Sequence, residues 1–250
     1  MNKEEQMLQK RLLELSSIAY QRDIVTFSDF LNLNELHILQ SIPKNELSTR
    51  YDLFGGYEYA ERQMVAFLPD ALCYEYEYPI DVLRVSAVHR KYAESLTHRD
   101  YLGALLNLGI ERSKIGDLAV TDDSCLIFCH ADMSDFVCRE FTRVCHTLIS
   151  VEKMQLSEFH YMPERAEIKG NVSSIRLDSV LSSAFPMSRS KLVGYIEGGK
   201  VFVNGKMITS NGYRLKENDI ISVRGMGRIQ YDSVISETKK GRYFIRLYKY

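Results

Sequence analysis

The chain has 250 residues, of which 45% are hydrophobic and 26% charged, so it can bury a sizeable core and is expected to divide into two or three modules. No apolar run approaches the roughly 20 residues of a membrane span, and the first residues lack the apolar region of a signal peptide, so a cytoplasmic protein without membrane contact is expected. Five cysteines without a C-x-x-C pair argue against a disulfide scaffold and a structural zinc site, and Cys125 and Cys129 are expected to be buried reduced thiols.

The net charge of −1 conceals a division of charge along the chain. Residues 171–250 contain 14 Lys and Arg against 6 Asp and Glu, a net charge of +8. The whole chain contains 32 Lys and Arg and 33 Asp and Glu, so residues 1–170 contain 18 Lys and Arg against 27 Asp and Glu, a net charge of −9. This asymmetry favours a polyanion site near the C-terminal end, although an ordinary solvated basic surface would give the same counts.

Residues 1–73 are expected to form a small α-rich domain. Apolar residues recur at helical spacing over 3–20, with charged residues opposite. Thr26 followed by Asp29 resembles the capping box of a second helix that ends at Pro43. A third helix is predicted over 60–68.

Residues 74–154 follow the order β-α-β-β-α-β, which predicts a central split βαβ, ferredoxin-like domain and an α+β fold class. The apolar period changes to two at Tyr74, and Thr97 with Asp100 marks a helix start that Gly109 terminates. Asp132 with Asp135 is expected to cap the second helix. The predicted strands cover residues 74–78, 83–87, 118–120, 124–129 and 147–151.

Residues 155–172 lose periodicity and are expected to be a linker with at most one strand, followed by a C-terminal module over 173–250. Within that module Ser188 is a favourable N-cap for a helix that Gly198-Gly199 terminates. The exposed amides of the first turn would lie beside Arg189 and Lys191 and would favour a phosphate. Asn204-Gly205 predicts a tight hairpin, and alternating strands are expected over 220–224 and 243–248.

Residues 173–230 resemble the S4 domain, an RNA-binding module named after the fourth protein of the small ribosomal subunit. Members bind structured RNA with the second helix and the hairpin that follows it. Where other members carry a further Arg in the middle of that helix, this chain has Val193-Gly194. By this resemblance the expected RNA-binding residues are Arg176, Ser188, Arg189, Lys191, Lys200, Asn204, Lys206 and Arg224.

A second cationic cluster brackets the predicted helix of the central domain. Its secondary RNA-binding candidates are His98, Arg99, Arg112 and Lys114, with the helix start favouring a phosphate near the first two. The opposite interpretation is that Asp100 and Asp117 pair these cations on an ordinary surface.

The run from Leu96 to Asp117, together with Ala87-Val88-His89, resembles the signature of the bacterial YlmH family. That family has an α-rich first domain, a central RNA-binding domain and a C-terminal S4 domain. The resemblance implies association with the large ribosomal subunit, contacts to rRNA and tRNA, and work alongside other factors of ribosome-associated quality control, in which the family holds peptidyl-tRNA while a stalled chain is extended. It also carries an older label related to cell division.

Motifs for catalysis are absent from the sequence: it has no G-x-S-x-G elbow, no phosphate-binding loop and no H-E-x-x-H helix. We therefore expect a noncatalytic RNA-binding protein, a monomer without metal or cofactor. Two alternatives stay open. One is a division-associated protein that recruits partners through its acidic first 170 residues, and the other is an RNA-modifying enzyme.

Overall fold

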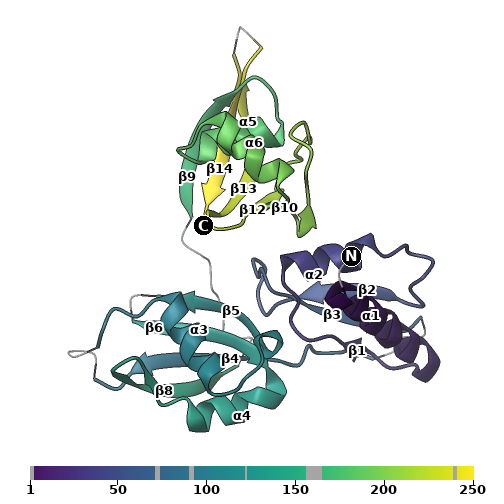
Figure 1. Ribbon diagram of the computed structural model, residues 1–250, viewed down its shortest axis with the longest axis vertical. Helices are drawn as coiled ribbons and strands as arrows, with labels where there is room; N and C mark the ends of the chain where they lie inside the picture. Colours follow the sequence, from purple (N-terminus) through teal and green to yellow (C-terminus); the bar gives the residue numbers. More distant parts are fainter. Residues whose placement is uncertain (1–2, 71–73, 90–92, 122, 156–164, 239–240) are drawn as a thin grey trace. The chain divides into compact units, whose positions relative to one another are not determined.

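The computed structural model describes residues 3–70, 74–89, 93–121, 123–155, 165–238 and 241–250 (Figure 1). The chain divides into two units, Met1–Tyr161 and Met162–Tyr250, and each is described by itself. The described residues form three sheets whose strand pairs are all antiparallel, with helices against them. The predicted α+β class is therefore confirmed.

The N-terminal part of the first unit combines two helices with a small sheet whose strand order is β1-β3-β2. Its elements are α1 (Lys3–Arg22), β1 (Thr26–Phe27), α2 (Leu33–Ser41), β2 (Arg50–Phe54) and β3 (Met64–Leu68). Leu12 of α1, Leu39 of α2 and Phe67 of β3 share one fully buried cluster. Burial of each such side chain contributes about 1.5–3 kcal/mol, so the sheet is part of the core and the α-rich description was incomplete.

Two predictions for this part are wrong. The third helix expected over 60–68 is instead β3, in which all five residues are buried. A short apolar strand buried on both faces has no alternating pattern, so its sequence resembles that of a buried helix. The second helix begins later than predicted, because its capping box uses Asn32 and Glu35, whereas Thr26 lies in β1.

The central part of the first unit follows the predicted order of strand, helix, strand, strand, helix and strand, with a short additional strand. Its sheet order is β5-β6-β4-β8-β7, and all pairs are antiparallel. The elements are β4 (Ile80–Ala87), α3 (His98–Asn107), the 3-10 turn η2 (Arg112–Lys114), β5 (Ile115–Val120), β6 (Ser124–His130), α4 (Ala131–Glu140), β7 (Arg143–Val144) and β8 (Thr147–Met154).

Local signals explain part of this arrangement. Thr97 caps α3, and its backbone N–H and hydroxyl donate to the Asp100 carboxylate at 2.7 and 2.6 Å, as predicted. The cap of α4 is instead His130, whose Nδ1 accepts from the Asp132 N–H at 3.2 Å. The strand expected over 74–78 is also absent from the described residues of that stretch, where the Tyr78 ring lies 5.4 Å from that of Phe27.

The two faces of the central sheet have different neighbours. Leu83, Val85 and Ile127 face one cluster that contains Tyr101 and Leu105 of α3 and Val137 of α4. Val82 and Phe128 face a second cluster that contains Phe30 and Met64 of the N-terminal part. A Cβ added at Gly116 would lie 2.7 Å from the Phe30 ring, so the N-terminal part packs closely on β5.

Asp117 connects the same two parts through polar contacts. Its Oδ2 accepts from the Tyr57 hydroxyl at 2.9 Å and from the Glu61 N–H at 2.7 Å, and its Oδ1 accepts from the Arg62 N–H at 3.1 Å. The Arg62 guanidinium reaches back to the carbonyl oxygens of Phe30 and Ile115, each at 2.9 Å. One carboxylate and one guanidinium therefore satisfy backbone groups on both sides of the contact.

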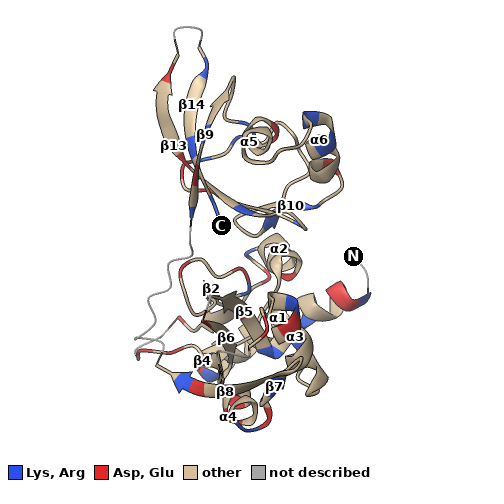
Figure 2. Ribbon diagram, turned by 90° about the vertical axis from the view of Figure 1, so that its left-hand side faces the viewer, with Lys and Arg blue, Asp and Glu red and all other residues tan. Residues whose placement is uncertain are grey.

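The second unit contains a six-stranded sheet of order β11-β10-β12-β13-β14-β9, with both of its helices on one face (Figure 2). The expected strand of the linker is β9, which pairs along its whole length with β14, while residues 156–164 lie outside the described residues. The elements are β9 (Ala166–Val172), α5 (Leu177–Ala184), α6 (Arg189–Glu197), β10 (Val201–Val203), β11 (Lys206–Met207), β12 (Ile220–Val223), β13 (Gly227–Glu237) and β14 (Tyr243–Lys249).

Replacement of Asp117 by Asn tests the polar connection in the first unit. An amide cannot accept at both of its ends, so at least one of the three donors loses its partner, and the free energy of unfolding should fall by about 1–3 kcal/mol. Calorimetry of the full chain should show this loss as a lower midpoint temperature of one unfolding transition. Glu152→Gln, at an exposed position of β8, is the control and should leave the midpoint unchanged. Equal midpoints for both variants would contradict the role of Asp117.

Candidate nucleic-acid interface

The first turn of α6 carries the cations that the sequence singles out. Ser188 occupies the N-cap position as predicted, but its hydroxyl makes no cap hydrogen bond and lies 3.2 Å from the Ser190 hydroxyl. The first backbone N–H groups of the helix are thus not occupied by this side chain. Arg189 and Lys191 are exposed beside them. A helix start with adjacent cations is suited to a phosphate group.

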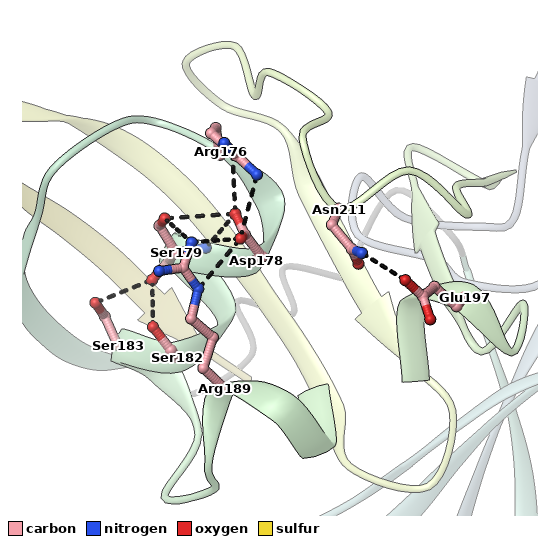
Figure 3. Close-up of polar contacts among 8 residues, drawn as sticks. All are labelled: Arg176, Asp178, Ser179, Ser182, Ser183, Arg189, Glu197 and Asn211. Atoms are coloured by element: carbon pink, nitrogen blue, oxygen red, sulfur yellow. Dashed lines mark hydrogen bonds and ion pairs between the residues drawn. The ribbon is translucent and has the colours of Figure 1, made fainter. Parts of the chain in front are cut away.

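A single buried carboxylate, that of Asp178, organises the two arginines of the site (Figure 3). Arg189 of α6 reaches its Oδ2 through Nη2 at 2.5 Å and through Nε at 3.2 Å. Arg176, which precedes α5, lies 3.3 Å from Oδ1 through Nε. The Asp178 side chain is 4% exposed, whereas those of Arg176 and Arg189 are 44% and 56% exposed. Each guanidinium is therefore fixed on one side and open to solvent on the other.

Opposing effects set the protonation of Asp178. Burial raises the pKa of this carboxyl, but the hydrogen bond and charge of Arg189, the charge of Arg176 and the Ser179 N–H together lower it. The net pKa lies below the ordinary value, so the group is ionised at neutral pH. One negative charge then faces two positive charges, which leaves a net positive charge beside α6.

The hairpin that follows α6 and the end of β12 present the remaining cations. Lys200 lies with Nζ 5.0 Å from the centre of the Tyr195 ring, and Arg224 with Cζ 5.9 Å from that of Phe202. These contacts orient both side chains while their charged groups stay exposed. Lys191 and Lys206 are also exposed, and neither forms an ion pair with a residue that the structure describes.

Asn204 has a different position from that expected of an RNA ligand. Its backbone φ is +49° and that of Gly205 is +78°, as the predicted tight turn requires. Its amide Nδ2 donates to Asp219 at 2.8 Å, and its Oδ1 accepts from the Ile220 N–H at 2.9 Å. The side chain thus secures the turn that holds Lys206 and β12 in place, and a contact of Asn204 with RNA stays a prediction.

The secondary candidates separate into two pairs. The Arg112 guanidinium donates to the carbonyl oxygens of Ile115 and Gly116, and burial lowers its pKa to about 10, with Arg62 adding to the effect. Lys114 forms an ion pair of 2.6 Å with Asp29. Lys114 therefore joins the central part to the N-terminal part, whereas the Arg112 side chain is held by carbonyl oxygens of the central part itself. His98 and Arg99 instead lie exposed at the start of α3.

His98 is the titratable member of the exposed pair. Desolvation lowers the pKa of its imidazole below 6.5, and the charge of Arg112 lowers it further, although Asp117 opposes the shift. The ring is therefore mostly neutral at physiological pH and can donate or accept a hydrogen bond, but it adds little positive charge.

Within the described residues there is no group of three His, Cys, Asp or Glu side chains placed to hold a metal ion. Cys125 and Cys129 are buried, and burial raises the pKa of each thiol to about 12. In the same described part of the chain no helix is both long and apolar enough to cross a membrane.

Sequence reasoning missed the partners that fix the arginines. Asp178 was not predicted as a partner of the arginines, and Asp219 was not predicted as a partner of Asn204. The available signal for Asp178 was its position two residues after Arg176 in a helix whose other face is apolar, since a carboxylate on such a face needs a cation. Its second partner, Arg189, comes from another helix and leaves no local pattern.

Two family models match parts of the chain, and known proteins are similar to it over longer stretches. The model described as "Putative RNA-binding domain in YlmH" matches residues 74–158, and the S4 domain model matches residues 175–221. The chain is 31% identical over 246 residues to "Ribosome-associated protein quality control protein P2" of Bacillus subtilis (strain 168), a match that covers 96% of this chain and 93% of the relative.

A solved structure is also similar. It is "Cell division protein ylmH from Streptococcus pneumoniae", with a TM-score of 0.51 and 20% sequence identity. The match covers 63% of this chain and 95% of that chain, and at this identity it shows a likeness of fold alone.

Replacement of Asp178 by Asn tests the shared carboxylate. A folded-state pKa below the ordinary value of 3.8 means that the stabilisation is complete above that value and is lost as pH falls through the folded-state pKa. At neutral pH the variant should lose about 1.5–3 kcal/mol of unfolding free energy, the range for hydrogen bonds to a charged group.

The difference between wild type and Asp178→Asn should shrink as the pH falls from 3.8 through the lower folded-state pKa, because the carboxyl of the unfolded chain takes up a proton first and that of the folded chain only at lower pH. Urea unfolding at a series of pH values measures it. Glu217→Gln, at an exposed position of the same unit, should show no such difference at any pH. A gap that stays constant into the acid range would contradict the assignment.

Proposed function

The chain belongs to the YlmH family, and on that premise we propose that it is a noncatalytic RNA-binding factor of ribosome-associated quality control. It associates with the large ribosomal subunit and contacts rRNA and tRNA while a stalled nascent chain is processed. The similar Bacillus subtilis protein carries a ribosome-associated quality control name, and both family matches concern RNA-binding domains. We infer a cytoplasmic protein from this partner, and one that works as a monomer.

The proposal is supported by the cations of α6 and of the segments next to it in the chain, which we group as the cationic surface around α6: Arg176, Arg189, Lys191, Lys200, Lys206 and Arg224. It belongs to the segment with a net charge of +8. Asp178 compensates one charge of its two arginines, and Lys191 and Lys206 have no ion-pair partner among the described residues. The excess positive charge faces the solvent, where phosphate groups can bind it.

The mechanism is one of positioning. The guanidiniums of Arg176 and Arg189 are planar and already oriented by Asp178, so they lose little freedom when they bind a phosphate. The helix start at Ser188 adds backbone N–H groups to the same surface. The lysines add charge without a fixed geometry. Such contacts hold folded RNA in one orientation without reading its sequence.

The three parts of the chain would then have separate roles. We infer an N-terminal domain over 1–73, a central RNA-binding domain of the split βαβ, ferredoxin-like class over 74–154 and the S4-type domain with its strand extension over 173–250. In the central domain Arg112 and Lys114 are occupied by the fold. His98 and Arg99 are therefore the residues of that domain that we assign to RNA.

Lys191→Gln and Lys206→Gln test the surface without touching the Asp178 cluster. Each removes one phosphate contact, so affinity for purified large ribosomal subunits should fall about 5- to 10-fold at moderate salt, and the slope of log affinity against log salt should become shallower by about one. Co-sedimentation at several salt concentrations measures both quantities. Lys10→Gln, an identical change on exposed α1, is the matched control.

Unchanged affinity and slope in both lysine variants would exclude the surface around α6 as the docking site. A second measurement separates the alternatives. After thorough RNase treatment, a pull-down that still recovers a division protein would favour a division-associated interaction protein. If nucleoside analysis of a deletion strain shows that an RNA modification is missing, that result would instead favour a modifying enzyme.

A further inference from the structure

The six-stranded sheet of the second unit has one face that its own helices do not cover. In Figure 2, α5 and α6 lie on the same side of the sheet. Ile229, Ile245 and Leu247 face those helices and are fully buried. Residues at alternate positions therefore face the other way, and strand register places Glu167, Tyr248 and Gln230 side by side in one row. We call this surface the open face, defined by Arg165, Lys169, Arg228, Arg246, Tyr248 and Tyr250.

Two arginine–tyrosine pairs form the centre of the open face. The Cζ atom of Arg165 lies 4.9 Å from the centre of the Tyr248 ring. That of Arg228 lies 5.4 Å from the centre of the Tyr250 ring. These distances are those of guanidinium groups in contact with aromatic faces. Charged and aromatic groups thus alternate across neighbouring strands rather than being scattered.

Gln230 joins the two pairs. Its Oε1 accepts from the Tyr250 hydroxyl at 2.8 Å and from Nη1 of Arg165 at 3.5 Å. Its Nε2 donates to Asn218 at 3.3 Å, which fixes the orientation of the amide. The array therefore has defined positions for both rings and both guanidiniums before any ligand binds, so binding would cost little side-chain entropy.

The charge of the open face is positive. The open face contains two carboxylates, those of Glu167 and Asp232, and four cations, which are Arg165, Lys169, Arg228 and Arg246. Arg246 lies between these carboxylates, 3.3 Å from one and 3.8 Å from the other, and Lys169 lies 3.7 Å from Glu167. The open face as a whole therefore carries two more positive than negative side chains.

We propose that the open face is a second RNA-binding surface, which takes unpaired nucleotides by stacking their bases on the Tyr248 and Tyr250 array while Arg165 and Arg228 bind the adjacent phosphates. Aromatic and guanidinium planes on a sheet are a suitable platform for bases that are not paired. Duplex RNA offers no such base faces. The inference rests on the proposed RNA-binding function, but it uses β9, β13 and β14, which lie outside the residues matched by the S4 model.

The two RNA surfaces would then differ in chemistry. The surface around α6 holds phosphates of folded RNA through charge, whereas the open face distinguishes strands with exposed bases from strands without them. A purely acidic partner, such as an acidic peptide, would need the charges but not the rings. This difference provides the test.

The experiment compares binding of a short oligouridylate with that of an abasic strand of equal length and charge. The full-length wild type should bind the oligouridylate at least about fivefold more tightly, because each stacked base contributes to affinity. Tyr248→Leu should abolish that preference, and Tyr248→Phe, which keeps the ring, should retain it. Arg165→Gln, outside the strands, should weaken binding of both probes while the wild-type fold is maintained.

Two outcomes would overturn the open face: a wild type that binds both strands equally, or a preference that survives in Tyr248→Leu. Equally weaker binding of both strands by Tyr248→Leu would indicate a site for acidic groups in general and would also overturn the open face. Lys191→Gln should weaken ribosome binding without changing the preference. Unchanged ribosome binding of Lys191→Gln would therefore contradict the proposed function but not the open face. Equal binding of the two strands by the wild type would contradict the open face but not the proposed function.

Discussion

The candidate interface depends on one buried carboxylate shared by two arginines. Asp178 is almost fully buried, and ionised groups are stable there only when cations and hydrogen-bond donors surround them. Arg189 of α6 and Arg176 before α5 supply those groups, so the same contact fixes the packing of the two helices and the direction of both guanidiniums. The contact therefore couples the stability of this unit to the direction of both guanidiniums, and the arginines cannot be treated as independent surface charges.

The first unit uses its cations in the opposite way. Arg62 donates to the carbonyl oxygen of Ile115 and Lys114 pairs with Asp29, and both contacts join the N-terminal part to the central sheet. Arg112 donates to a carbonyl oxygen of the central part itself. From the sequence alone, the residue types of Arg112 and Lys114 and their separation along the chain look like those of residues that bind phosphate. The structure separates them from His98 and Arg99 only because burial and partners differ. A basic residue near an RNA-binding motif is thus not in itself evidence of RNA contact.

Sequence reasoning succeeded where a structure depends on neighbouring residues and failed where it depends on distant ones. The cap of α3 at Thr97, the turn at Asn204-Gly205 and the start of α6 at Ser188 are local features, and all three were predicted correctly. The helix expected over 60–68 is strand β3, since burial on both faces removes the alternation. Strand β13 was missed, because its pairing with β14 is interrupted by register shifts after Tyr231 and Val234. For the site, the cations were found but their partners Asp178 and Asp219 were not, because these contacts form only in the folded chain.

The place of β9 in the sheet has a consequence for any attempt to isolate the RNA-binding module. This strand precedes α5 in sequence, yet it pairs with seven consecutive residues of the last strand, from Tyr243 to Lys249. A fragment that begins at residue 173 would lack it and would leave β14 as a bare edge with unpaired N–H and C=O groups. Such an edge invites pairing with other molecules. A fragment that begins before Arg165 would keep the edge covered and would be the better starting point for study of this half of the chain.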